Sequence, residues 1–194
     1  IGITSKVSKL MKKNFLLLLL CVVPFISFAQ DVLTVDSVVT VPNKNADEIY
    51  SAISKWLATN VDVQSAQAVV TSDDEKRSAT TKAVFKFEVK NMTWYAMSGV
   101  ISCTVDVTAR DGRYRIRFSN FVHDSSTPDQ VTGTWDEGLL YSEIPQGRTK
   151  GVRGRQHKEV YKRAGKRIQE WTDSQIAALT SYINSFTNIE DEDW

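Results

Sequence analysis

Alternation of apolar and polar residues is the strongest pattern in the chain, and it extends from residue 80 to residue 122. Such alternation is typical of strands with one face on a core and the other in solvent. Asp111-Gly112 interrupts it with a dipeptide that favours a two-residue hairpin turn. If Arg110 pairs with Arg113 across this turn, the apolar positions of both strands share one face, so turn chemistry and pattern predict the same register. The predicted inward pairs are Val107 with Ile116 and Val105 with Phe118, and Asp106 faces Arg117 on the outer face.

A strand and a helix are predicted before this hairpin. Residues 32–41 are rich in β-branched side chains and predict the strand. Residues 45–59 carry apolar side chains at helical spacing and predict the helix. Asn45, with Glu48 three positions later, predicts a capping box at its start. Trp56 lies on the apolar stripe of this helix, so we expect it in the core.

The other segments give weaker or more open predictions. The apolar stripes near the C-terminal end of the sequence predict either one long helix kinked near residue 172 or two helices. These segments are predicted to be a strand at 61–71, a charged turn at 72–78, an irregular loop at 124–154, a helical part at 155–187 and an acidic tail at 188–194.

The first thirty residues predict export. Residues 11–29 combine two lysines, an apolar run of 14 residues that contains Pro24, and small side chains before a cleavage point after Ala29. This combination is typical of a secretory signal peptide. A membrane-spanning helix needs ~20 apolar residues, so a permanent anchor is the weaker interpretation. Residues 1–10 precede Met11 and are interpreted as a translated leader or a fragment artefact. We therefore expect an exported protein, periplasmic or associated with the outer membrane of a Gram-negative bacterium.

Composition narrows the class of protein further. The chain has 194 residues, 42% of them hydrophobic and 24% charged, which suits one folded domain with appendages. Its 24 basic and 23 acidic residues disfavour a strongly basic nucleic-acid-binding protein. Removal of residues 1–30 takes four lysines and no acid, so the mature chain carries a net charge of −3 and retains one cysteine. That cysteine, Cys103, falls on the inward face of its predicted strand, so we expect a buried thiol.

Motifs for catalysis or metal binding are scarce. Neither His123 nor His157 has a second ligand at metal-binding spacing, and Asp73 with Asp74 fits a hairpin tip. We therefore predict no catalytic residue, no metal site and no cofactor. A hydrolytic triad assembled in space from His123 and its neighbours stays the weaker interpretation.

Positive charge gathers in two places that predict a site for an anion or a partner. Clustered cations bind phosphate, sulfate or carboxylate groups without sequence-specific contacts. In the alternative interpretation these side chains are merely solvated, and acids such as Asp136 or Glu137 balance the helix. The candidates are Arg153, Arg155, Lys158, Lys162 and Lys166 on the C-terminal helix, and Arg113, Arg115 and Arg117 on the outer face of the hairpin.

Two motifs in this order of elements carry a family resemblance. They are the helix segment Asp-Glu-Ile-Tyr to Lys-Trp-Leu at 47–57 and the hairpin Asp-Gly-Arg-Tyr-Arg-Ile-Arg-Phe at 111–118. The chain resembles an uncharacterised family of exported proteins of Bacteroidota with a TBP-like fold. The resemblance implies an α+β fold over residues 31–123 in the order β-α-β-β-β-β-α. One curved antiparallel sheet of about five strands would have an N-terminal helix after strand 1 and C-terminal helices packed on one face. It implies no reaction, substrate or cofactor.

Three functions remain open at this point. The favoured one is a non-catalytic binding or protein-interaction module of the cell envelope, with an envelope protein or an anionic polymer or lipid as partner, and not nucleic acid. The second is a hydrolase of envelope polymers with residues 124–154 as a lid, which requires polar groups to converge beside that loop. The third is a structural subunit of an envelope assembly, which an exposed apolar patch of Trp135, Leu139 and Leu140 would favour.

Overall fold

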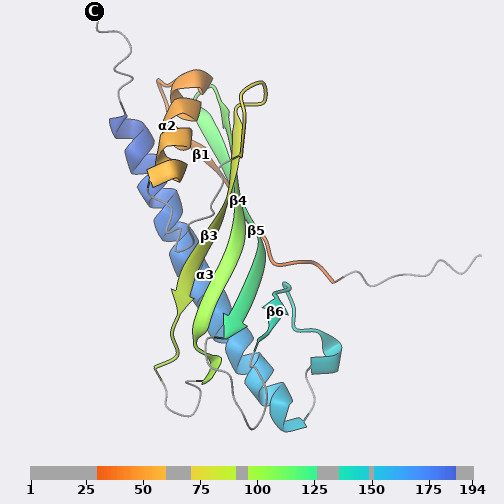
Figure 1. Ribbon diagram of the computed structural model, residues 1–194. Coiled ribbons are helices and arrows are strands. Elements are labelled where there is room, and N and C mark those ends of the chain that lie inside the picture. The colour runs from red at the N-terminus through yellow and green to blue at the C-terminus, as the bar shows by residue number, and fades with distance from the viewer. Residues whose placement is uncertain (1–29, 60–70, 91–95, 126–135, 149–150, 187–194) are drawn as a thin grey trace, which may run out of the picture.

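A computed structural model describes residues 30–59, 71–90, 96–125, 136–148 and 151–186. The expected signal peptide at 11–29, the acidic tail and nearly all of the expected strand at 61–71 lie outside these residues. Figure 1 shows the arrangement of the elements. They are β1 (Val35–Thr40), α2 (Ala46–Thr59), β2 (Thr71–Asp73), β3 (Ser78–Phe87), β4 (Gly99–Arg110), β5 (Arg113–Ser125), β6 (Gly138–Leu139), the short 3₁₀ helix η2 (Gln146–Arg148) and α3 (Gly151–Ser185).

The strands form one antiparallel sheet in the order β1-β5-β4-β3-β2, and β6 pairs with the far end of β5. The predicted hairpin register is confirmed: Arg110 pairs with Arg113, and Val107 lies opposite Ile116. Gly112 in the turn has a φ of 70°, a conformation that glycine adopts without steric cost. The predicted fold class is confirmed, because a helix follows strand 1 and a long helix crosses the sheet.

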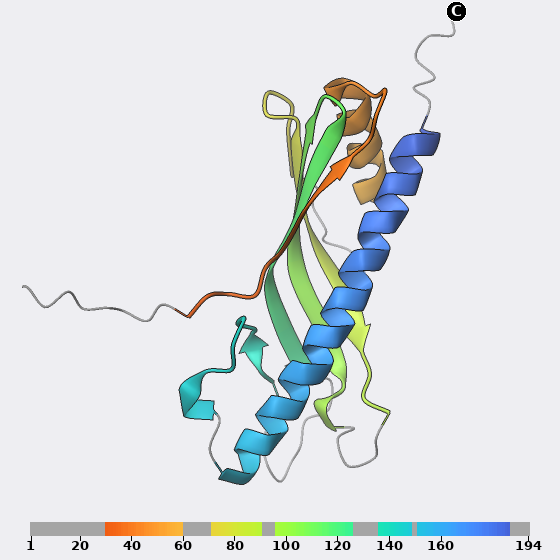
Figure 2. The ribbon, with the colours of Figure 1, turned by 180° about the vertical axis from the view of Figure 1, so that it is seen from behind.

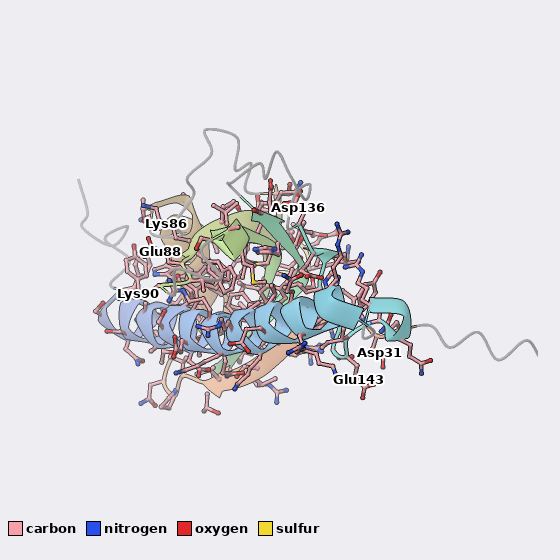
Figure 3. The ribbon with its side chains drawn as sticks, turned by 90° about the horizontal axis from the view of Figure 1, so that it is seen from below. Asp31, Lys86, Glu88, Lys90, Asp136 and Glu143 are labelled. Carbon is pink, nitrogen blue, oxygen red and sulfur yellow. The ribbon has the colours of Figure 1, made fainter. Side chains whose placement is uncertain are left out.

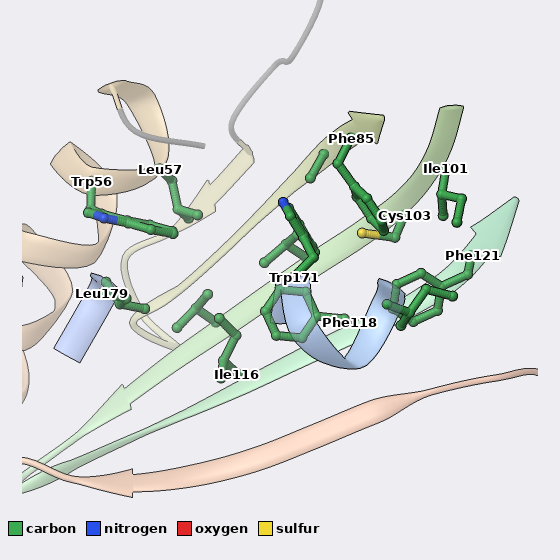
Figure 4. Packing of buried hydrophobic residues seen from close by; sticks show 14 of the residues in the cluster. Trp56, Leu57, Phe85, Ile101, Cys103, Ile116, Phe118, Phe121, Trp171 and Leu179 are labelled. Atoms are coloured by element: carbon green, nitrogen blue, oxygen red, sulfur yellow. The ribbon is translucent and has the colours of Figure 1, made fainter. Parts of the chain in front are cut away.

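Both helices lie on the same face of the sheet (Figures 1 and 2). Inward residues of β3, β4 and β5 are buried and alternate with exposed or half-buried outward residues. Trp171 of α3 stacks on Phe85 with ring centroids 4.3 Å apart, and its edge contacts Phe118 at 5.6 Å (Figure 4). Cys103 lies in the same layer and is 3% exposed, so the predicted burial is confirmed. This burial raises the pKa of its thiol to about 12 and leaves it protonated.

The start of α2 has the predicted capping box. The backbone N–H of Glu48 donates to Asn45 Oδ1 at 2.9 Å, and the N–H of Asn45 donates to Glu48 Oε2 at 2.8 Å. The N–H of Ala46 donates to Asp111 Oδ1, which attaches the helix to the β4–β5 turn. Trp56 is 3% exposed, so its place in the core is also confirmed.

The C-terminal helical part is one continuous helix, and the alternative of two helices is wrong. Thr172 is fully buried, and its hydroxyl donates to the carbonyl oxygen of Gln169 inside the helix. The residue expected to break the helix therefore packs within it. Among the described residues, no helix has both the length and the apolar character needed to cross a membrane.

Backbone hydrogen bonds hold the segment that precedes α3. The N–H of Leu140 donates to the carbonyl of Phe121, and the N–H of Ser142 donates to that of Asp31. Figure 3 shows Asp31 and Glu143 on one side of the molecule and Lys86, Glu88 and Lys90 on the opposite side. Part of the stretch predicted to be irregular therefore pairs with the sheet and with the first described residues.

Candidate functional site

The outer face of the sheet carries rows of aligned charged and polar side chains. The register of β1, β5 and β4 creates each row, because partners in neighbouring antiparallel strands point to the same side. In the described residues, neither helix covers this face. From the turn inward, the rows are Thr40, Arg113 and Arg110; then Val38, Arg115 and Thr108; then Asp36, Arg117 and Asp106.

Asp36 bridges two of these arginines. Its carboxylate accepts from Arg115 Nε at 2.9 Å and from Arg117 Nη2 at 3.0 Å. Chiefly through the hydrogen bond from Arg115, and further through Arg117, the pKa of Asp36 falls to about 2. The predicted pairing of Asp106 opposite Arg117 in the strand register is confirmed. The two side chains have other partners: Asp106 accepts a hydrogen bond from the Thr80 hydroxyl at 2.6 Å, and Arg117 forms its ion pair with Asp36.

Arg110 and Arg113 differ from their neighbours, because neither forms an ion pair with an acid in the described part of the chain. They border a shallow groove of about 660 Å³ at the turn end of the sheet. Val38, 60% exposed, adds apolar surface to it. We call this feature the outer-face groove; it is lined by Asp36, Val38, Thr108, Arg110, Arg113, Tyr114 and Arg115. Planar guanidinium groups that are free of a carboxylate can bind an external carboxylate, phosphate or sulfate in a bidentate manner.

The second predicted cluster forms an exposed stripe on α3. Arg155, Lys158, Lys162 and Lys166 recur at helical spacing and are exposed, as is Arg153. Lys166 lies 3.6 Å from Glu170, a weak exposed pair. The stripe and the arginines of β5 belong to separate surfaces, since α3 packs on the opposite face of the sheet. The structure therefore separates the two sets of predicted residues.

A buried polar cluster around Glu137, one of the acids expected to balance the basic helix, forms at the N-terminal end of α3. Glu137 is 3% exposed. Its Oε1 lies 2.5 Å from His157 Nδ1, and its Oε2 accepts from Arg148 Nη1 at 3.0 Å. Arg148 Nη1 also donates to the backbone carbonyl of Glu137 at 2.9 Å. One carboxylate thus joins the segment before β6 to η2 and α3.

His123 completes this cluster from the sheet. Its Nδ1 accepts from the backbone N–H of Glu137 at 3.4 Å, and its Nε2 lies 2.9 Å from the carbonyl oxygen of Met97. These partners require a neutral ring with the proton on Nε2. Burial is the main cause that lowers the pKa of His123, which agrees with the neutral form. His123, which is 1% exposed near the end of β5, is therefore a buried structural contact.

The cluster favours a structural role over hydrolysis. Glu137 is 3% exposed and each of its oxygens contacts a side chain of the described chain, so its carboxylate links parts of the fold. In the described residues no group of three or more His, Cys, Asp or Glu side chains could hold a metal ion. Leu140 is 1% exposed, which removes it from the apolar surface patch that a structural subunit would need; Trp135 lies outside the described residues.

No spacing signal along the chain could have revealed this cluster. Its members are separated by 11 and 20 residues, and each is unremarkable alone. Only the return of the chain along β6 and into α3 brings them together.

Comparisons with known proteins match this fold. The model of the family described as "Domain of unknown function (DUF4468) with TBP-like fold" matches residues 36–124. A crystal structure of a TBP-like protein from Parabacteroides distasonis aligns with a TM-score of 0.56 and 12% identity, over 80% of this chain and 95% of that one. A DUF4468 family protein from Bacteroides ovatus aligns with a TM-score of 0.57 and 11% identity, over 80% and 88%.

No curated protein matches the chain. At these identities the two solved structures show the fold alone, and the resemblance to a Bacteroidota family agrees with them. Over residues 36–124, which span β1 to nearly the end of β5, the chain is similar to the DUF4468 domain with a TBP-like fold.

Proposed function

We propose that this protein is an exported, non-catalytic binding module of the cell envelope that holds an anionic ligand in the outer-face groove. The observation that carries the proposal is the pair Arg110 and Arg113, which border an open groove without an acidic partner in the described chain. Export is proposed from the signal-peptide pattern of residues 11–29, with a periplasmic or outer-membrane-associated location.

The charge distribution of the groove supports an anion over a cation or a neutral ligand. Asp36 offsets about one of the two charges of Arg115 and Arg117, and Arg110 and Arg113 add two more. The side chain of Val38 provides an apolar contact beside them. A ligand with repeated carboxylate, sulfate or phosphate groups along an extended backbone fits this arrangement best.

Binding of a defined polyanion tests this proposal. Fluorescently labelled poly-L-glutamate is titrated with the protein, and anisotropy gives the apparent Kd at two salt concentrations. We expect the double variant Arg110→Ala, Arg113→Ala to bind at least about tenfold more weakly, which corresponds to about 1.4 kcal/mol. The control removes two exposed charges from α3, Arg155→Ala and Lys158→Ala. Equal weakening in both variants would show binding by net charge alone, and weakening only in the α3 variant would move the site to that helix.

Export is tested separately in the native cell. Fractionation locates the protein, and mass spectrometry of its N-terminus identifies the cleavage site. We expect a mature chain that begins at Gln30. A full-length chain in the cytoplasm would refute the envelope location without affecting the groove.

A further inference from the structure

One margin of the sheet is formed by β1. It is the end member of the strand order, and among the described strands it pairs only with β5. The N–H of Val41 donates to the carbonyl of Gly112 on the β5 side. Backbone groups of an antiparallel strand alternate in direction from residue to residue, so the odd-numbered residues of β1 point the same way as Val41. The even-numbered residues therefore direct their N–H and C=O groups away from the sheet. We call them the open edge of β1: Asp36, Val38 and Thr40.

The described part of the chain leaves this edge without a partner. Its three residues are exposed, and no described residue forms a backbone hydrogen bond with them on the side away from β5. Natural proteins usually protect such an edge with lysine, proline or a bulge. The opposite margin has this protection, because Lys82 and Lys86 are exposed along β3 and Arg167 Nε donates to the carbonyl of Lys86 at 3.2 Å. Residues 35–40 contain neither lysine nor proline, so β1 is suited to pair with another strand.

The open edge is complementary to a second copy of itself. In an antiparallel pair, residues directly opposite each other point to the same face. When Val38 lies opposite Val38 of the second copy, Asp36 lies opposite Thr40. All three residues then exchange backbone hydrogen bonds with the second copy, about six in total. Each Asp36 carboxylate faces a hydroxyl and not a second carboxylate.

Other registers that keep the same faces together are less favourable. A two-fold axis at Val39 places Asp36 opposite Pro42, whose nitrogen carries no hydrogen. An axis at Ser37 places Val38 opposite Asp36, so that an apolar side chain lies against a carboxylate. The axis at Val38 instead covers this valine with an equal side chain. Val38 is 60% exposed, and within the described ranges it is the large apolar residue that the fold leaves exposed.

The same register extends the charged rows of the outer face across the axis. Thr40 lies beside Arg113 in its own sheet, so Asp36 of the second copy lies two strands from Arg113. At about 4.8 Å per strand, the two backbones are roughly 10 Å apart, which an arginine and an aspartate side chain can span together. Arg113 forms no ion pair with an acid in the described part of its own chain. The second copy therefore brings a carboxylate toward a guanidinium group that lacks one.

We propose that two copies of this chain pair through the open edge of β1, antiparallel and with the two-fold axis at Val38. The two sheets become one continuous sheet. The two outer-face grooves lie next to the axis, because Asp36 and Val38 line each of them. A single pair of short strands buries little area, so the dimer is reversible and not obligate. The inference does not depend on the proposed function, since backbone groups and Val38 carry it without a ligand.

Directed disulfides test the register. Every variant carries Cys21→Ser, and the other native thiol, Cys103, is buried. Residues opposite each other in a hydrogen-bonded pair have Cα atoms about 5.5 Å apart, within the range that a disulfide requires. Under mild oxidation we expect Val38→Cys to cross-link to itself. We also expect Asp36→Cys to cross-link to Thr40→Cys when the two variants are mixed in equal amounts.

The matched control is Thr40→Cys alone. Its two thiols belong to positions that lie at least roughly 13 Å apart along the paired strands, which a disulfide cannot span. We expect this variant to remain monomeric on non-reducing electrophoresis. Equal cross-linking of Val38→Cys and Thr40→Cys would show random collision and overturn the pairing, and so would the absence of any cross-link.

Sedimentation equilibrium of the native chain is the second measurement. We expect a monomer–dimer equilibrium, and Val38→Lys should weaken it at least about tenfold, because two ammonium groups would lie opposite each other. Thr108→Lys adds the same charge to the same row two strands away and should leave the Kd unchanged. Circular dichroism verifies that both variants fold. A native chain that stays monomeric at every concentration, or a dimer that Val38→Lys does not weaken, would refute the inference.

Discussion

Replacing Glu137 with glutamine tests whether the buried cluster holds the N-terminal end of α3 in place. The change keeps the shape of the side chain and removes its charge from between His157 and Arg148. A hydrogen bond to a charged group contributes about 1.5–3 kcal/mol, and breaking a fully buried ion pair costs about 3–5 kcal/mol. Here the side chains of His157 and Arg148 are 22% and 41% exposed, so water partly replaces the lost contacts. We therefore expect the free energy of unfolding to fall by about 2–3 kcal/mol.

Urea unfolding followed by circular dichroism measures this loss. With a slope of about 2 kcal/mol per molar urea, the midpoint should fall by roughly 1 M or slightly more. The matched control is Glu143→Gln, an exposed acid on the same segment, which should change stability by less than about 0.5 kcal/mol. A double-mutant cycle with His157→Gln isolates the pairwise contribution. Equal midpoints for the Glu137 and Glu143 variants, or no coupling in the cycle, would refute the structural role of the cluster.

Three further predictions concern the stability of the fold. Burial lowers the pKa of His123 below its ordinary 6.5, so the unfolded chain binds more protons than the folded chain. The stability that this residue contributes is therefore complete above about pH 6.5 and is lost as the pH falls toward the folded pKa. Urea midpoints measured from pH 7.5 to 5 should fall accordingly, and His123→Asn should reduce this pH dependence. A Cβ at Gly99 would lie 2.0 Å from the carbonyl oxygen of Asp124, so Gly99→Ala should lower the free energy of unfolding by about 2 kcal/mol. Gly165 lies on a helix with open space around it, so Gly165→Ala should raise the free energy of unfolding. Equal effects of the two substitutions in chemical unfolding would contradict this packing. Asn45→Ala removes the capping box and should lower Tm by about 2–4 °C in calorimetry, and an unchanged Tm would show that the cap contributes nothing.

The hairpin of β4 and β5 and the first helix were predictable because their signals are local. Asp111-Gly112 sets the turn, and the two-residue period sets the face, so the pairing of Arg110 with Arg113 needs no distant contact. Asn45 and Glu48 likewise bond to each other within one helical turn. The outward position of Arg113, Arg115 and Arg117 follows from the same alternation.

Other features depend on segments that are far apart in the sequence. Thr172-Asp173 has the composition of a helix break, yet packing of Trp171 on Phe85 holds α3 continuous across it, because tertiary burial outweighs a local preference. The ion pair of Arg117 goes to Asp36 because β1, which is 81 residues away, pairs with β5 on the other side.

The sequence by itself determined the strand faces, the first helix and the buried thiol, since a short apolar period or a capping pair specifies each of them. Only the tertiary structure decided which arginines are neutralised, because Asp36 reaches two of them and leaves Arg110 and Arg113 without an acid in the described chain. It also decided the environment of Glu137, which lies next to β6 and is only 3% exposed to solvent. Burial removes water as the competing partner, so the contacts of a charge in the core are chosen by the elements that the fold brings together.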